Sequence, residues 1–162
     1  DMLFLAQADN GLLVPSREPV DLAAQVRELF DFFDALAEEK GLRLALTGSG
    51  QVSGDTLMLR RALANLISNA IRHSPRGGSI QVRIETSGGE TTLAIENSGE
   101  PIPPQHLARI FDRFYRADPS RHRSDEGAGL GLAITRSIIR AHGGEIGVRS
   151  VTGGVCFELR MA

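Results

Sequence analysis

The sequence predicts an α+β fold, a two-layer α/β sandwich in which three helices cover one face of a mainly antiparallel mixed sheet. Five segments alternate apolar and polar residues, which is typical of strands that bury one face only. Three other segments carry apolar residues at helical spacing and supply the second layer. The chain has 162 residues, of which 41% are hydrophobic and 23% charged, enough for one domain with a full core.

Helix signals are clear at several points of the chain. Asp21 and Asp55 are expected N-cap residues, because each precedes a run of apolar residues at helical spacing. Ser74-Pro75 and Gly143-Gly144 are expected to end the helices before them. The predicted helices cover residues 2–8, 21–41, 55–74, a short segment after Pro104, and 131–142.

The strands are predicted from period-two alternation. The sequence Ser-Gly-Gly-Glu at residues 87–90 separates two alternating runs, which predicts an antiparallel hairpin. Residues 116–129 are rich in arginine and glycine and nearly free of apolar side chains, so we expect a mobile loop there. The predicted strands cover residues 43–46, 80–84, 93–95, 146–148 and 155–159.

Composition excludes several classes of protein. A formal net charge of −2 and the absence of Trp argue against a nucleic-acid partner. The single cysteine, Cys156, cannot form an internal disulfide, and the four histidines form no metal-ligand cluster. No apolar run approaches the roughly 18 residues of a membrane helix, and no basic segment marks a signal peptide. We therefore expect a soluble protein from a reducing compartment.

One polar helix face suggests a ligand site. Asn65, Asn69, Arg72 and His73 are spaced to project from the same side of the second long helix. A solvated face is the simpler interpretation, but asparagines in mid-helix cost stability relative to Glu or Lys. An amide oxygen is a suitable ligand for Mg²⁺, and an arginine one turn further can reach a phosphate.

Two further segments are candidates for the same site. Residues 96–102, Glu-Asn-Ser-Gly-Glu-Pro-Ile, form a polar strand end that runs into a turn, and alone they need no function. Residues 127–132, Gly-Ala-Gly-Leu-Gly-Leu, place glycines directly before a helix, where backbone N–H groups can meet an anion. They match neither the dinucleotide fingerprint nor a Walker loop. The pattern favours a phosphate site of another type.

Four segments in order resemble the N, G1, F and G2 boxes of sensor histidine kinases. The first three carry Asn65 to Pro75, Glu96 to Ile102 and Phe111 to Arg116, and the fourth is the glycine segment 127–132. The resemblance covers the chain from about residue 15 onward and implies the catalytic ATP-binding domain of the GHKL ATPase superfamily, with a mobile ATP lid. The Glu-Asn start of the second box is most similar to the heavy-metal (copper, silver, zinc) sensor kinases.

The resemblance implies a role for each matching residue. Asn69 would bind Mg²⁺, Arg72 the phosphates and Asn97 the adenine amino group, while Arg116 and Arg121 would approach the γ-phosphate as the lid closes. Phe111 would pack the lid at its hinge, together with Phe114 and Tyr115. The implied ATP-binding residues are Asn65, Asn69, Arg72, His73, Asn97, Gly99, Ile102, Phe114, Tyr115, Gly127, Gly129, Leu130, Gly131 and Leu132, with Asn69, Arg116 and Arg121 as the catalytic ones.

Three positions depart from the family pattern. Asn97 stands where the family usually has an aspartate, and its amide can accept the same hydrogen bond but also carries a donor. Pro101 replaces the second glycine of its box, which stiffens the turn. Val155 replaces a threonine, so a hydroxyl near the adenine is missing.

The resemblance implies a kinase that transfers the γ-phosphoryl of Mg-ATP to a histidine on its own dimerisation and phosphotransfer domain, for relay to a response regulator. Residues 1–14 would be the tail of that domain and a linker, and residues 15–162 the catalytic domain. The acceptor-histidine motif is absent from this sequence, so the chain alone should not phosphorylate itself. The parent protein would be a homodimeric inner-membrane sensor with this part in the cytoplasm, without direct membrane contact.

Two alternatives remain open. A GHKL-type ATPase would need a carboxylate near the first asparagine to activate water, but Arg61 and Ala62 stand there. A degenerate module that only binds nucleotide or a partner is suggested by Asn97, Pro101 and Val155. The remaining histidines, His106, His122 and His142, are expected at the surface or at helix ends without a ligand role, and Cys156 is expected to face away from the helices.

Overall fold

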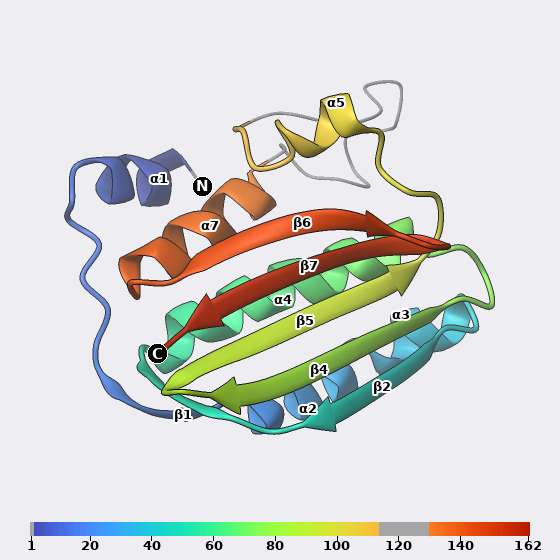
Figure 1. The fold of residues 1–162 in the computed structure, drawn as a ribbon, viewed down its shortest axis with the longest axis horizontal. Helices are drawn as coiled ribbons and strands as arrows, with labels where there is room; N and C mark the ends of the chain where they lie inside the picture. Colours follow the sequence, from blue (N-terminus) through green and yellow to red (C-terminus); the bar gives the residue numbers. More distant parts are fainter. Residues whose placement is uncertain (1, 114–129) are drawn as a thin grey trace.

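The computed structural model describes residues 2–113 and 130–162. Helices lie on one side of a five-stranded sheet, as Figure 1 shows, so the predicted two-layer α+β fold is confirmed. The helices are α1 (Met2–Asp9), α2 (Leu22–Phe32), α3 (Asp34–Glu39), α4 (Thr56–His73), α5 (Pro104–Leu107) and α7 (Gly131–Ala141). The main sheet contains β2 (Arg43–Gly48), β4 (Ser79–Ser87), β5 (Glu90–Ser98), β6 (Glu145–Val151) and β7 (Gly154–Met161).

The sheet has the order β2-β4-β5-β7-β6 and is mainly antiparallel. Only β2 and β4 pair in parallel. The predicted hairpin joins β4 to β5, and Ser87 pairs with Glu90 across it. Its two central residues, Gly88 and Gly89, have φ angles of 61° and 81°, which a two-residue turn of this kind requires and glycine adopts without strain.

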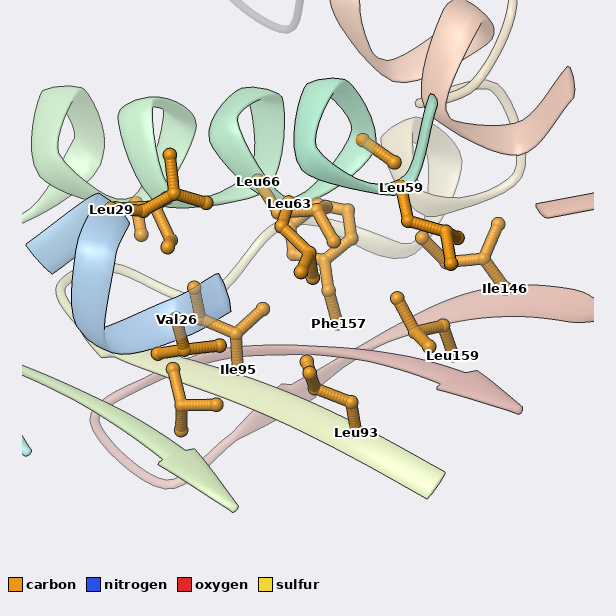
Figure 2. Packing of buried hydrophobic residues seen from close by; sticks show 14 of the residues in the cluster. Val26, Leu29, Leu59, Leu63, Leu66, Leu93, Ile95, Ile146, Phe157 and Leu159 are labelled. Atoms are coloured by element: carbon orange, nitrogen blue, oxygen red, sulfur yellow. The ribbon is translucent and has the colours of Figure 1, made fainter. Parts of the chain in front are cut away.

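The core fills the space between α2, α4 and the sheet. Figure 2 shows Leu63 and Leu66 of α4 pointing toward Phe157 of β7, and Leu59 pointing toward Leu159 of the same strand. Each of these five side chains is at most 3% exposed. Burial of a leucine-sized side chain contributes roughly 1.5–3 kcal/mol, so this contact fixes how α4 lies on the sheet.

The predicted long helix over residues 21–41 is wrong in one respect. It is split at Phe33, whose ψ of 3° falls outside the helical range, into α2 and α3. The Ala37 amide still donates to Phe33 O at 3.0 Å, so the chain continues in nearly the same course. The turn buries Phe33, at 9% exposed, and leaves Phe32 at 77%. Apolar spacing alone could not reveal it.

A small second sheet was not predicted. It pairs β1 (Glu18–Asp21) with β3 (Gln51–Gly54) antiparallel. Each strand has only four residues, too few for alternation to be distinguished from a turn. Residues 116–129, where the mobile loop was expected, lie outside the described residues.

The start of α4 is fixed by a polar corner. Asp55 caps the helix by accepting a hydrogen bond from Met58 N at 3.1 Å, and its second oxygen accepts from Ser16 N at 3.1 Å. Partial burial acts to raise the pKa of Asp55, but these backbone hydrogen bonds act in the opposite direction, and the net pKa lies below the usual value for aspartic acid. Its ionised form therefore stabilises the fold.

We expect Asp55→Ala to reduce the free energy of unfolding at neutral pH by about 1 kcal/mol, the usual contribution of an N-cap. Because the pKa of Asp55 is lowered on folding, this contribution is present above the unfolded-state pKa and is lost as the pH falls through the folded-state pKa. The measurement is urea unfolding of both proteins at neutral pH and at about pH 3, near the carboxylate pKa range.

The control is Asp55→Asn, which keeps a capping oxygen without a charge. It should show a smaller loss at neutral pH. A difference between wild type and Asp55→Ala that is the same at both pH values would contradict the role given to the ionised carboxylate.

Candidate functional site

Helix α4 presents a polar face opposite its buried one. Its buried side chains are Leu59, Ala62, Leu63, Leu66, Ile67, Ala70 and Ile71. Asn65 and Asn69 lie half-buried on the remaining side, and Arg72 and His73 are exposed at the end of the helix. The structure thus places the four candidate residues of the helix on the side that the spacing predicts.

The N-terminus of α7 lies against this polar face. The Asn65 Nδ2 donates a hydrogen bond to Gly131 O at 3.2 Å, and Thr135 Oγ1 donates to the same oxygen at 2.9 Å. A Cβ on Gly131 would lie 3.9 Å from the Asn65 side chain. The contact brings Gly131, at the start of α7, beside Asn65 of α4.

No side chain caps this end of α7 among the residues that the structure describes. The first intrahelical bond is from Ile134 N to Leu130 O at 2.9 Å, so the preceding amides of the first turn have no carbonyl partner within the helix. Such amides, together with the helix dipole, favour an anion. Arg72, in the last turn of α4, carries a guanidinium group, which commonly binds phosphate.

The second part of the candidate site is the end of β5. Asn97 is only 3% exposed, and it pairs with Ile80 on one side and Val155 on the other. Its Nδ2 donates to Ser98 O at 3.0 Å. That bond turns the donor of the amide toward the backbone and leaves the carbonyl oxygen as the group that can accept from a ligand.

The turn after β5 touches the end of α4. A Cβ on Gly99 would lie 3.0 Å from His73 O, and Gly99 has a φ of 141°, so the close approach needs glycine. Ser98 Oγ accepts from Ser79 N at 2.7 Å and fixes the turn to β4. Asn97 and His73, far apart in sequence, are thereby brought to the same end of the layer.

Gly154 and Val155, at the start of β7, lie beside the end of β5. A Cβ on Gly154 would lie 2.1 Å from Asn97 O, so glycine is required for β7 to pair there. Val155 is buried and places an apolar side chain where the family pattern has the hydroxyl of a threonine. Ile102 is half-buried against the core, and its carbonyl accepts from Ser150 Oγ at 2.9 Å.

Sequence reasoning missed contacts that support the site from a distance. Lys40 Nζ donates to Ile71 O at 2.8 Å and Arg72 O at 3.3 Å, and so binds carbonyls of the last turn of α4. Thr135 is fully buried and bonds Gly131 O. The Lys40 contact has no sequence signal, because it depends on the packing of separated elements. The Thr135 bond is local to α7 and joins a threonine to the carbonyl four residues before it.

Other residues differ from expectation or lie outside the description. Phe111 lies in the core, with its ring centroid 6.0 Å from that of Phe157 and beneath the guanidinium of Arg136 at 5.6 Å. His142, expected at a helix end, is there but buried. Cys156 lies on the sheet face away from Phe157, and burial raises the pKa of its thiol. The predicted site residues outside the described part are Phe114, Tyr115, Arg116, Arg121, Gly127 and Gly129, and His122 lies there too.

A cavity of about 380 Å³ lies elsewhere, between α1 and α7. Arg113, Arg136 and Arg140 line it, and its described lining includes none of the implied ATP-binding residues. Within residues 2–113 and 130–162, no group of three His, Cys, Asp or Glu side chains could hold a metal ion. In the same part of the chain, no helix is long and apolar enough to cross a membrane.

Comparison with known proteins identifies the family. Residues 54–162 match the model of the "Histidine kinase-, DNA gyrase B-, and HSP90-like ATPase" family. The chain is 52% identical over 162 residues to the sensor histidine kinase CusS of Escherichia coli K12, and 47% over 161 residues to the probable sensor protein PcoS of Escherichia coli. Both alignments cover 99% of this chain and 34% of the relative, so the chain spans about one third of their length.

Similar solved structures support the same family. The catalytic domain of histidine kinase ThkA superposes with a TM-score of 0.80 at 27% identity, over 90% of this chain and 95% of that one. The full-length ShkA in complex with AMPPNP superposes with a TM-score of 0.85 at 27% identity, over 99% of this chain and 34% of that one. The chain therefore belongs to the histidine kinase-, DNA gyrase B- and HSP90-like ATPase family, as an ATP-binding catalytic domain of the sensor histidine kinase type.

Proposed function

We propose that this chain binds Mg-ATP between α4, the end of β5 and the start of α7, and donates the γ-phosphoryl to a histidine on a separate dimerisation and phosphotransfer domain. The observation that carries the proposal is the hydrogen bond from Asn65 to Gly131. It joins the polar face of α4 to the uncapped N-terminus of α7, which gives one site both amide oxygens and helix amides.

The adenine would bind at the end of β5. The carbonyl oxygen of the buried Asn97 would accept a hydrogen bond from the adenine amino group, and Gly99, His73 and Ile102 surround that end of the layer. Asn97 is held between two strands, so it is rigid before the ligand arrives. A fixed acceptor discriminates well, because the wrong base leaves a buried polar group unpaired.

The phosphates would lie between Asn69, Arg72 and residues 130–132. The residues present fit Mg²⁺: the half-buried Asn69 offers one neutral oxygen, and this ion usually takes one or two protein ligands with phosphate oxygens and water completing its shell. A bound Mg²⁺ would neutralise phosphate charge. Arg116 and Arg121 are proposed to act on the γ-phosphate.

The acceptor would come from outside the chain. His142 has both ring nitrogens in hydrogen bonds to backbone groups, which removes it as a nucleophile. The chemistry needs the imidazole of the other domain held in line with the γ-phosphorus, where an N–P bond forms as the bond to the ADP oxygen breaks. This chain's part is to hold the nucleotide and neutralise its charge.

The domain boundary and partners follow as proposals. We assign residues 1–14 to the end of the dimerisation and phosphotransfer domain and its linker, and residues 15–162 to the catalytic domain. ThkA has been solved in complex with the response regulator protein TrrA, and we propose a cognate response regulator for the parent of this chain. By its likeness to the heavy-metal sensors, that parent would be a homodimeric inner-membrane sensor of metal ions, with this domain in the cytoplasm.

Two other functions have less support. For water-activating ATPases of this fold, a carboxylate is needed near Asn65, but Ala62 is fully buried and Arg61 is a cation. A degenerate binding module is favoured by Val155 and Pro101, because both remove features of the usual adenine site. The experiments below separate these possibilities.

Asn69→Ala should abolish most of the stabilisation by Mg-ATP and leave the fold intact, because the side chain lies on the ligand side of α4. Ligand at 100 times its dissociation constant stabilises a protein by about 2.7 kcal/mol. Thermal unfolding with and without Mg-ATP measures this. Leu57→Ala, at an exposed position of the same helix, is the control and should shift like wild type. An equal shift for Asn69→Ala would mean that the polar face is only solvated.

ATP should bind more tightly than GTP, by roughly 5- to 100-fold, because guanine presents an acceptor to the oxygen of Asn97, and an unpaired buried polar group costs about 1–3 kcal/mol. Calorimetry with both nucleotides measures the ratio. Asn97→Asp keeps the acceptor and should retain the preference, and Asn97→Leu should lose it. Equal affinities of the wild type for ATP and GTP would rule out this role of Asn97.

Phosphoryl transfer is tested with labelled ATP. The chain alone should acquire no acid-labile label, and a separately made dimerisation and phosphotransfer domain from the same parent protein should acquire it when mixed with the chain. Acid-labile label on the isolated chain would contradict the proposal. ATP binding without label on the added domain would favour the degenerate module, and steady release of inorganic phosphate would favour the ATPase.

A further inference from the structure

A buried histidine connects the far end of α7 to the start of α4. His142 is 6% exposed and caps the C-terminus of α7. Its Nε2 accepts a hydrogen bond from Asp55 N at 3.0 Å, and its Nδ1 lies 2.8 Å from Ile138 O. Because a backbone amide can only donate, Nε2 is the acceptor, and the proton of the neutral ring is on Nδ1, which donates to Ile138 O.

The surroundings hold the imidazole in place. A Cβ on Gly54 would lie 2.8 Å from His142 Cδ2 and 2.8 Å from Leu59, so the ring packs closely on the backbone of β3. Asp55, whose amide it binds, is also the N-cap of α4 and accepts from Ser16 N, in the segment before β1. The imidazole therefore joins α7 to a corner that three other segments share.

The two polar contacts of α7 with α4 are at opposite ends of the helix. At one end Asn65 bonds Gly131, and at the other His142 bonds Asp55. Helix α7 has 11 residues, a length of about 16 Å, and residues 55–65 of α4 span about 15 Å at 1.5 Å per residue. The two helices are antiparallel. Because the length of α7 matches the span of residues 55–65, both contacts form together at only one register of α7 on α4.

We infer that His142 is a positioning residue for nucleotide binding: by fixing the register of α7 on α4, it holds residues 130–132 at the phosphate side of the site. The inference rests on the proposed nucleotide site. A shift of α7 by one turn, about 5.4 Å, would break both end contacts and withdraw the first-turn amides from Asn69. The apolar contacts between the two helices are less directional and do not select one register as strongly.

Two substitutions separate the two hydrogen bonds of the ring. The amide of His142→Asn occupies the place of Nδ1, so it can keep the bond to Ile138 and loses the bond to Asp55. The amide of His142→Gln extends one bond further and can restore an acceptor for the Asp55 amide. The control for lost stability is Ile84→Val, a buried position on β4, which β5 and β7 separate from β6, the strand that contacts α7.

The first measurement uses the protein without nucleotide. Hydrogen exchange of the Ile134 amide, in the first turn of α7, should be about tenfold faster in His142→Asn and near wild type in His142→Gln. Ile84→Val should leave the ratio of Ile134 exchange to global exchange unchanged. Exchange in His142→Asn that matches wild type, or that rises only as much as global unfolding does, would overturn the inference whether or not the protein binds ATP.

The second measurement is the affinity for Mg-ATP by calorimetry. His142→Asn should bind about tenfold more weakly, and His142→Gln within about threefold of wild type. Equal losses in the two variants, in proportion to their lost stability, would overturn the inference and leave the nucleotide site standing. A wild type that does not bind Mg-ATP would instead contradict the proposed function, while the exchange result still decides the role of His142.

Discussion

Every part of the candidate site depends on the packing of α4 on the sheet. The leucines of its apolar face lie on Phe157 and Leu159 of β7 (Figure 2). This contact determines which way Asn65 and Asn69 point. A helix with one face in the core cannot rotate without exposing that face, so the direction in which the asparagines point is set by the core as well as by the bond of Asn65 to Gly131. The polar face therefore has a fixed orientation before any ligand binds.

The second rigid part of the candidate site is the end of β5, where neighbouring backbone segments approach closely. Gly154 lets β7 pair directly with Asn97, and Gly99 lets the next turn touch the end of α4. Both positions exclude a side chain for steric reasons, so they hold Asn97, which we propose reads the adenine, between two strands and beside a helix end. Asn97 is buried and bonded through its donor, which leaves the carbonyl oxygen to act. Binding then costs little ordering of the protein, which favours affinity.

The sequence predicts an element well where its apolar pattern is long and where capping or turn residues mark its two ends. The 18 residues of α4, with Asp55 before them and Ser74-Pro75 after, could be assigned closely, and so could the β4–β5 hairpin with its two glycines. The break at Phe33 and the four-residue strands of the second sheet could not, because they arise from packing. For the site, spacing placed the asparagines of α4 on one face, but the hydrogen bond between Asn65 and Gly131 joins residues 66 apart.

The other features that the sequence does not reveal are hydrogen bonds between residues far apart in the chain. His142 has no motif around it that reveals a partner at Asp55, and Lys40 has none that reveals the carbonyls of Ile71 and Arg72. Such bonds become visible only when two elements have been packed together. These bonds also set the register of one element on another. A small sliding of the two elements breaks a hydrogen bond but leaves their apolar contacts largely intact.

The most direct test of the account is an NMR titration of the ¹⁵N-labelled chain with Mg-ADP. We expect the side-chain amides of Asn69 and Asn97 and the backbone amides of Gly99 and Gly131 to shift most. The amides of β1, which lies at the end of the layer away from the end of β5, should be unchanged (Figure 1). Shifts concentrated instead on Ser137 and Arg140, in the cavity between α1 and α7, with the two asparagines unaffected, would contradict it.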